Sequence, residues 1–299
     1  MKRKLKRIYQ LLKNATIQYK QDDPVRLAGT AAFFMVFAMA PIIIIIISII
    51  GILLGQETIQ EKIFVEINTL IGEKGTQYIK DLVANYQDTT RGTIGTIVGF
   101  IVFLFTSTTF FAVIQRSLNF IWRVKARPSK GIIQILKVRV LSFGLILSLG
   151  LVLIVSLIID ALLTMLGDFI SDLLPGLTYY IIQAGNFIIS FGVIMLFFAM
   201  IFKFLPDAKI RWNVTWTGAF ITTILFMVGR AIIGLALGNT NISLMYGAAG
   251  SLVVILLWVF YSAIIFFYGA EITQQYAKMY SEDIVPKKHA VRIQVNEVK

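Results

Sequence analysis

The chain has 299 residues, of which 57% are hydrophobic and 15% charged, and its mean hydropathy is +0.79. Soluble domains are far less apolar, so this composition indicates an integral membrane protein. The net charge of +12 could suggest a nucleic-acid-binding protein, but the basic residues follow the membrane pattern described below. The sequence has no cysteine, which excludes disulfides, thiolate metal sites and cysteine nucleophiles.

The first 26 residues form a basic segment with a helical pattern. Leu5, Ile8, Leu12 and Tyr19 recur at nearly helical spacing, and Lys and Arg fill the remaining positions. This pattern predicts an interfacial helix whose basic face lies against the anionic headgroups of membrane lipids. The alternative is a solvated basic tail without a helix.

Six apolar segments follow, and each is long enough to cross a bilayer. The hydrocarbon core is ~30 Å thick, so a spanning helix needs about 20 residues. The predicted spans are 27–54, 93–121, 140–166, 179–205, 214–238 and 247–269. The fold class is therefore an all-α integral membrane protein, with a transmembrane domain over residues 27–276. Pro41 lies in the middle of the first span, where a proline should kink the helix.

The connection 55–92 is the only long one on its side of the membrane, and it is amphipathic. Apolar residues recur at helical spacing in two stretches, with Gly72 and Gly75 between them. Two short amphipathic helices are predicted. They could pack on the membrane surface, on the bundle or on another subunit, and we expect packing on the protein itself.

Most of the 28 Lys and Arg residues lie on alternate connections. They cluster before the first span, after the second, after the fourth and in the polar tail 277–299. Because basic residues concentrate on the cytoplasmic side, both termini are predicted to be cytoplasmic. Trp122 and Trp212 fall at cytoplasmic ends of spans, where an indole is expected at the membrane interface.

The last third of the chain carries motifs more specific than hydropathy requires. Together with Pro41 in the first span, they include Pro206, Trp212, Trp216, Tyr246, Gly247, Trp258 and Gly269. In these residues the chain resembles the BrkB/YihY family of bacterial inner-membrane proteins, formerly labelled ribonuclease BN. The resemblance implies a six-span bundle in the cell membrane with both termini inside. It also implies an association with envelope integrity, and a role in moving lipids has been suggested for some members.

The residues themselves argue against the ribonuclease label. Metal-dependent hydrolysis of a phosphodiester needs several carboxylates or imidazoles that converge on one or two ions. The one histidine, His289, lies in the polar tail, and the acidic residues on the cytoplasmic side are scattered. We therefore expect no enzymatic activity, no metal, no cofactor and no nucleic-acid partner.

Ionisable residues inside the spans are the remaining signal of function. Arg116, Lys203 and Glu271 fall near the inner ends of spans two, four and six, where we expect Glu271 to pair with Arg116 or Lys203. The alternative for these three is snorkelling to the headgroups. Asp160 and Arg230 fall at similar depth in the outer parts of spans three and five, so they could pair, and Arg230 is expected to face the interior.

These features predict a protein that helps a lipid or another amphipathic solute to cross the cytoplasmic membrane or exchange between its leaflets. The alternative is a non-transporting scaffold for envelope assembly, which would bind an envelope partner or a second copy through its outer helices. A groove containing Arg230 would favour transport, whereas an exposed apolar patch on the outer helices would favour the scaffold.

Overall fold

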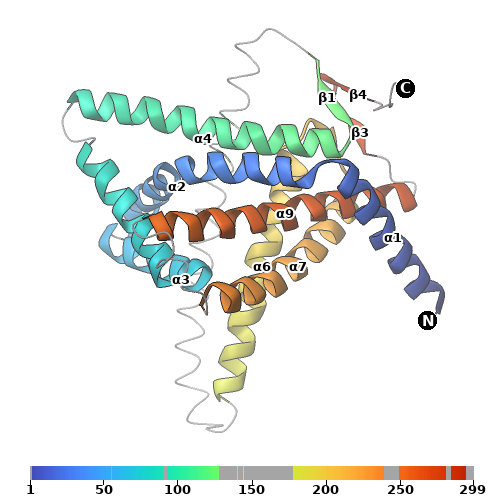
Figure 1. The fold of residues 1–299 in the computed structure, drawn as a ribbon, viewed down its shortest axis with the longest axis horizontal. Coiled ribbons are helices and arrows are strands. Elements are labelled where there is room, and N and C mark those ends of the chain that lie inside the picture. Colours follow the sequence, from blue (N-terminus) through green and yellow to red (C-terminus); the bar gives the residue numbers. More distant parts are fainter. Residues whose placement is uncertain are drawn as a thin grey trace.

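The computed structural model of the chain describes residues 2–54, 56–89, 93–127, 140, 144, 178–238, 249–280 and 284–293 (Figure 1). Its helices and strands are α1 (Lys2–Gln21), α2 (Pro24–Leu54), α3 (Gln56–Thr89), α4 (Thr93–Ile121), β1 (Val124–Ala126), α6 (Thr178–Phe204), β2 (Ala208–Lys209), α7 (Trp212–Gly238), α9 (Gly250–Met279), β3 (Val285–Pro286) and β4 (Ala290–Arg292). Most of the third predicted span lies outside the described residues.

Helices are present at five of the predicted spans, as α2, α4, α6, α7 and α9. Four of them contain a stretch that is long and apolar enough to cross a membrane. These stretches are Pro24–Ile44, Gln183–Phe204, Trp212–Ile233 and Leu252–Met279. The prediction of a helical membrane protein is confirmed for the described chain, and the count of six spans stays a prediction. The helix α2 continues through Pro41, which leaves the carbonyl four residues earlier without its usual amide donor.

Helix α9 is the centre of the bundle. It packs against α1, α2, α3, α4 and α7, and Figure 1 shows it running between α2 and α7. Its buried side chains are mostly apolar or small, among them Ile255, Phe267 and Ala270, all at 0% exposure. A helix that is apolar on nearly every side is expected at the core of a membrane bundle.

Helices α7 and α9 approach closely because each has the sequence Gly-x-x-x-Thr at their contact. A Cβ added to Gly218 would lie 1.9 Å from Thr273 Oγ1, and one added to Gly269 would lie 2.0 Å from Thr222 Oγ1. Both hydroxyls donate back to their own helices, Thr222 to the Gly218 carbonyl and Thr273 to the Gly269 carbonyl, at 2.7 Å each. Small residues let membrane helices approach closely, so the motif residue Gly269 is explained by packing.

Helix α3 is two helical segments joined at a bend, as the glycines in the sequence predicted. Gly72 has φ 76° and ψ 174°, a conformation that is essentially restricted to glycine. The apolar face of the helix is buried in the bundle, with Phe64 at 6%, Ile79 at 0% and Val83 at 1% exposure. Their neighbours come from α2 and α9. The described apolar face of this outer connection thus packs on the protein itself.

Helix α1 confirms the predicted N-terminal helix and packs against the bundle along one stripe. Leu11, Ala15 and Tyr19 are buried against α9, whereas Ile8 and Leu12 are exposed. The buried residues are four positions apart and therefore form one stripe along the helix. Tyr19, one of the residues of the predicted pattern, lies on this buried stripe, whereas Ile8 and Leu12 lie on the surface, and the interfacial position of the helix stays a prediction.

The C-terminal tail packs on the bundle through two short antiparallel ladders. Strand β4 pairs with β1, the segment that follows α4, and Val124 lies opposite Arg292. Strand β3 pairs with β2 in the connection between α6 and α7. Both ladders lie at the end of the bundle where the two termini are also found, at the right of Figure 1. We call this the terminal end.

Candidate functional site

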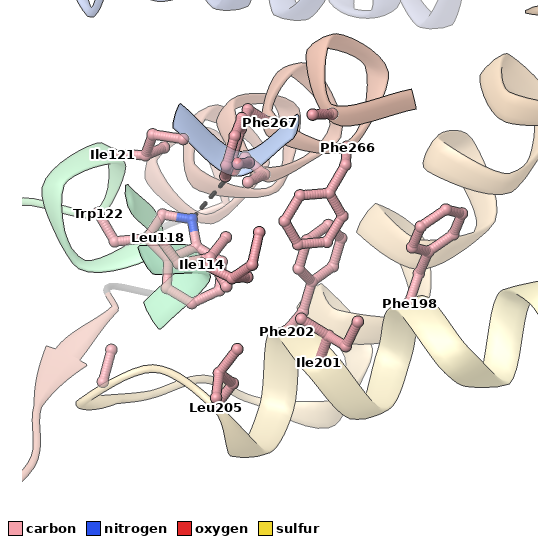
Figure 2. Close-up of a cluster of buried hydrophobic side chains, with 14 of the residues drawn as sticks. Ile114, Leu118, Ile121, Trp122, Phe198, Ile201, Phe202, Leu205, Phe266 and Phe267 are labelled. Carbon is pink, nitrogen blue, oxygen red and sulfur yellow. Dashed lines mark hydrogen bonds between the residues drawn. The ribbon is translucent and has the colours of Figure 1, made fainter. Parts of the chain in front are cut away.

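The terminal end is closed by a core of aromatic and aliphatic side chains from α4, α6 and α9. Figure 2 shows Trp122 pointing into this core, where its indole Nε1 donates to the Ala270 carbonyl at 3.0 Å. Trp122 is 2% exposed, and its ring meets the edge of Phe202 at 6.0 Å between centroids. The expectation of an interfacial Trp122 is wrong because a partner for its N–H is available inside the protein. Trp212, at 47% exposure, fits the interfacial expectation.

A buried polar network centred on Asp207 lies beside this core. The carboxylate Oδ2 accepts from the side-chain amides of Asn119 at 2.9 Å and Gln115 at 3.2 Å, and Asn119 Oδ1 accepts from the Asp207 backbone N–H at 2.9 Å. The other oxygen, Oδ1, is 2.7 Å from His289 Nε2. Asp207, Asn119 and Gln115 are all buried. These hydrogen bonds therefore satisfy polar groups that would otherwise be buried without a partner.

This network attaches the C-terminal tail to the connection between α6 and α7. Besides the contact of His289, the Lys287 amide donates to the Asp207 carbonyl at 2.8 Å and Lys287 Nζ to the Pro206 carbonyl at 2.5 Å. The motif residues Pro206 and Asp207 therefore hold the tail. Sequence reasoning missed the network because its members are 82 to 92 positions apart. The sequence offered no local signal for this pairing.

Replacing His289 by alanine should loosen the tail without unfolding the bundle. Loss of the hydrogen bond between the His289 imidazole and the Asp207 carboxylate should weaken the attachment of the tail by about 1.5–3 kcal/mol, the range for hydrogen bonds to charged groups. Hydrogen exchange of residues 285–292 should then become roughly tenfold faster or more. The matched control is Lys288→Ala, which removes an exposed neighbouring side chain. Equal exchange rates in the two variants would show that His289 does not hold the tail.

A second polar cluster forms where the α1–α2 junction meets α4 and α9. Arg123 Nη2 donates to Asp22 Oδ1 at 2.6 Å, and Asp22 is 2% exposed. Burial raises the pKa of the Asp22 carboxyl above its ordinary value, although the hydrogen bond and the charge of Arg123 act in the opposite direction. Arg123 has φ 56°, a left-handed conformation that costs roughly 1–2 kcal/mol outside glycine. The buried ion pair and a bond from the Ile293 amide to the Arg123 carbonyl at 2.9 Å hold it there.

Glu271 belongs to this second cluster and is completely buried on α9. Its Oε1 accepts from Gln275 Nε2 at 2.7 Å, whereas its Oε2 has no hydrogen-bond partner. The charged groups that act on it are Asp22, Lys278 and Arg123. An ionisable side chain buried in a membrane bundle is expensive and therefore marks a candidate functional site.

The structure corrects the expected pairing of Glu271 with Arg116 or Lys203. Arg116 is exposed, and its Nε donates to the Ala112 carbonyl of its own helix at 3.1 Å. Lys203 Nζ donates to the Ile210 carbonyl and lies 4.7 Å from the centre of the Trp212 ring. The two cations bond to carbonyls near them in the chain, so they do not meet the acid on α9.

The other predicted residues are placed as follows. Arg230 is partly buried on α7, and Asp160 lies outside the described residues, so their pairing stays a prediction. Trp216 stacks on Trp212 at 6.1 Å, and Trp258 meets the edge of Phe226 at 6.2 Å. The motif residues Tyr246 and Gly247 also lie outside the described residues.

The chain is similar to membrane proteins of several bacteria. The model of the family described as virulence factor BrkB matches residues 15–294. A UPF0761 membrane protein of Aeromonas salmonicida is 27% identical over 89% of this chain and 90% of its own length. One of Alteromonas mediterranea is 26% identical over 85% and 83%. No solved structure matches. The family match covers nearly the whole chain and confirms the resemblance of its motifs, so the protein is a membrane protein of the BrkB family.

Proposed function

We propose that this protein moves a lipid or a similar amphipathic solute across the bacterial cytoplasmic membrane or between its leaflets, without enzymatic chemistry. In this proposal the terminal end faces the cytoplasm. Basic residues of α1, among them Lys6, Arg7 and Lys13, lie near both termini at this end. Basic segments of this kind face the cytoplasm and the anionic headgroups of its leaflet.

The observation that carries the proposal is that α4 and α6 pack together at their C-terminal ends but diverge towards their N-terminal ends. Their C-terminal ends meet in the core around Trp122 and Phe202. Figure 1 shows the two helices diverging from there, so that their N-terminal ends lie at separate edges of the view. In the diverging parts, Phe105 of α4 and Phe187 and Ile188 of α6 are 59–68% exposed. Exposed apolar side chains on these described parts of α4 and α6 suit helices that face lipid, the phase from which an amphipathic solute would enter.

Arg230 supplies a cation in the same part of the bundle. It follows Trp212 by 18 residues, so it lies about 27 Å along α7 from the terminal end. This distance places it near the opposite face of a hydrocarbon core ~30 Å thick, where an arginine side chain can reach an anionic headgroup. In the proposal Arg230 contacts the anionic headgroup of the passing solute.

The packing of α3 favours transport over the scaffold. A scaffold that recruits a partner through its outer amphipathic helices needs an apolar face exposed on them. The described apolar face of α3 is instead buried against α2 and α9. Among the described residues of α3, Val65 at 57% is an exposed large apolar side chain, so this helix offers little apolar surface for recruiting a partner.

The experiment measures lipid exchange in vesicles that contain the purified protein. Fluorescent phospholipid is placed in both leaflets and dithionite is added outside, so that the inner-leaflet signal is quenched only if lipid moves. The wild type should cause nearly complete quenching, and Arg230→Leu should restore protection of the inner leaflet. Arg116→Leu is the matched control, because it removes an exposed arginine that bonds only to its own helix.

Size-exclusion profiles of both variants show whether they fold. Protection of the inner leaflet in wild-type vesicles would contradict lipid exchange. If a well-folded Arg230→Leu variant exchanged lipid as fast as the wild type, the protein would still be a lipid exchanger, but Arg230 would have no role in the exchange.

A further inference from the structure

Three buried side-chain oxygens in the described part of the chain have no hydrogen-bond partner. They are Asp22 Oδ2, Glu271 Oε2 and Gln274 Oε1. Their residues are 2%, 0% and 4% exposed, so none of these oxygens is met by bulk water. Native proteins pair the great majority of buried polar groups, and an unpaired one requires an explanation. All three are acceptors, so a donor or a cation is needed to satisfy them.

The three residues lie at one junction of the fold. Asp22 is tied to Arg123 by a 2.6 Å hydrogen bond. The residue before Arg123 is Trp122, whose indole bonds to the carbonyl of Ala270, and Ala270 precedes Glu271. These two hydrogen bonds bring the α1–α2 junction, the end of α4 and the segment of α9 that contains Glu271 together. Gln274 is one helical turn beyond Glu271, on the same face of α9.

Among the described residues, the charged groups packed into this junction are two buried carboxylates and one partly buried guanidinium, so one negative charge has no buried positive partner. Arg123 compensates for Asp22, and Glu271 receives only the neutral amide of Gln275. Lys278 is exposed and acts on both acids from further away. Tyr19, which packs against Tyr268 of α9, donates its hydroxyl to the Ile264 carbonyl. Burying an uncompensated carboxylate is costly, so one further positive charge would stabilise the cluster.

We propose that Asp22, Glu271 and Gln274 form a binding site for a single sodium ion. Hard cations prefer oxygen ligands of this kind, carboxylate and amide carbonyl. A proton on one carboxylate would neutralise the charge but would leave at least one of the other oxygens unpaired, whereas a metal cation takes several oxygen ligands at once. The site goes beyond the proposed transport and does not rest on it, since sodium binding alone would hold α1, α4 and α9 together.

The test is the thermal unfolding of the full-length protein in detergent, with sodium chloride replacing choline chloride at constant ionic strength. Sodium should raise the unfolding midpoint by a few degrees in a saturable way, because a ligand that binds only the folded state stabilises it. Glu271→Gln and Asp22→Asn should each raise the sodium concentration for half of this effect at least tenfold. Asp23→Asn is the matched control, because that neighbouring carboxylate is exposed and pairs with Arg26.

Gln274→Ala is a second probe, since it leaves every charge in place. It should weaken the sodium effect and should not alter the response to choline. The proposal is overturned if sodium has no effect beyond choline in the wild type, or if the effect survives in Glu271→Gln. None of these readings uses lipid exchange, so failure of the sodium site and failure of the transport proposal are distinguishable.

Discussion

Gly269→Ala should lower the midpoint of thermal unfolding in detergent by about 3–10 °C, corresponding to roughly 1–3 kcal/mol of overpacking. The added Cβ would lie 2.0 Å from Thr222 Oγ1, 2.7 Å from its Cγ2 and 2.8 Å from its Cβ. Thr222 is β-branched and its hydroxyl is bonded to the Gly218 carbonyl, so its side chain has little freedom to move away. The helices α7 and α9 must therefore separate.

Two further variants test this explanation. Gly192→Ala places the same methyl group on α6, where nothing lies within 4 Å of the new Cβ, so the midpoint should stay unchanged or rise slightly. Thr222→Ala, combined with Gly269→Ala, removes the two closest atoms and should recover part of the lost stability. If Gly269→Ala were as stable as Gly192→Ala, the close approach of α7 and α9 would be wrong.

The elements of the fold that follow from local pattern were predictable from the sequence. Apolar runs of about 20 residues placed α2, α4, α6, α7 and α9, because the thickness of the bilayer sets the length of a spanning helix. The bend at Gly72 was predicted for the same local reason, since glycine breaks the apolar pattern of the connection. The helix at the N-terminus was found, but its buried face was not.

The candidate site depended on contacts between distant segments, which one sequence does not show. Glu271 was identified as a buried ionisable residue of a span, but its charged neighbours Asp22 and Arg123 come from the α1–α2 junction and the end of α4. Depth in the membrane was the only guide to its partners, and depth does not tell which helices touch. His289 was assigned to a polar tail because nothing near it in the sequence indicates the buried Asp207.

The core at the terminal end leads to the prediction with the largest effect. Trp122→Ala should destabilise the protein by about 3–5 kcal/mol, because it leaves a large cavity in a well-packed core. Trp122 is among the largest fully buried side chains described, and it contacts the ring of Phe202 as well as the Ala270 carbonyl. The midpoint of thermal unfolding in detergent measures the loss, which should exceed that of Gly269→Ala.

Comparison with a second tryptophan separates burial from membrane anchoring. Trp212 is 47% exposed, and its described contacts are ring contacts with Phe204 and Trp216 and the cation of Lys203. Trp212→Ala should therefore cost only about 1 kcal/mol. Trp122→Phe should fall between the two alanine variants, since it keeps an aromatic ring in the core but removes the donor to the Ala270 carbonyl. If both alanine variants were equally destabilised, Trp122 would act as an interfacial anchor like Trp212, and the sealed core at the terminal end would be wrong.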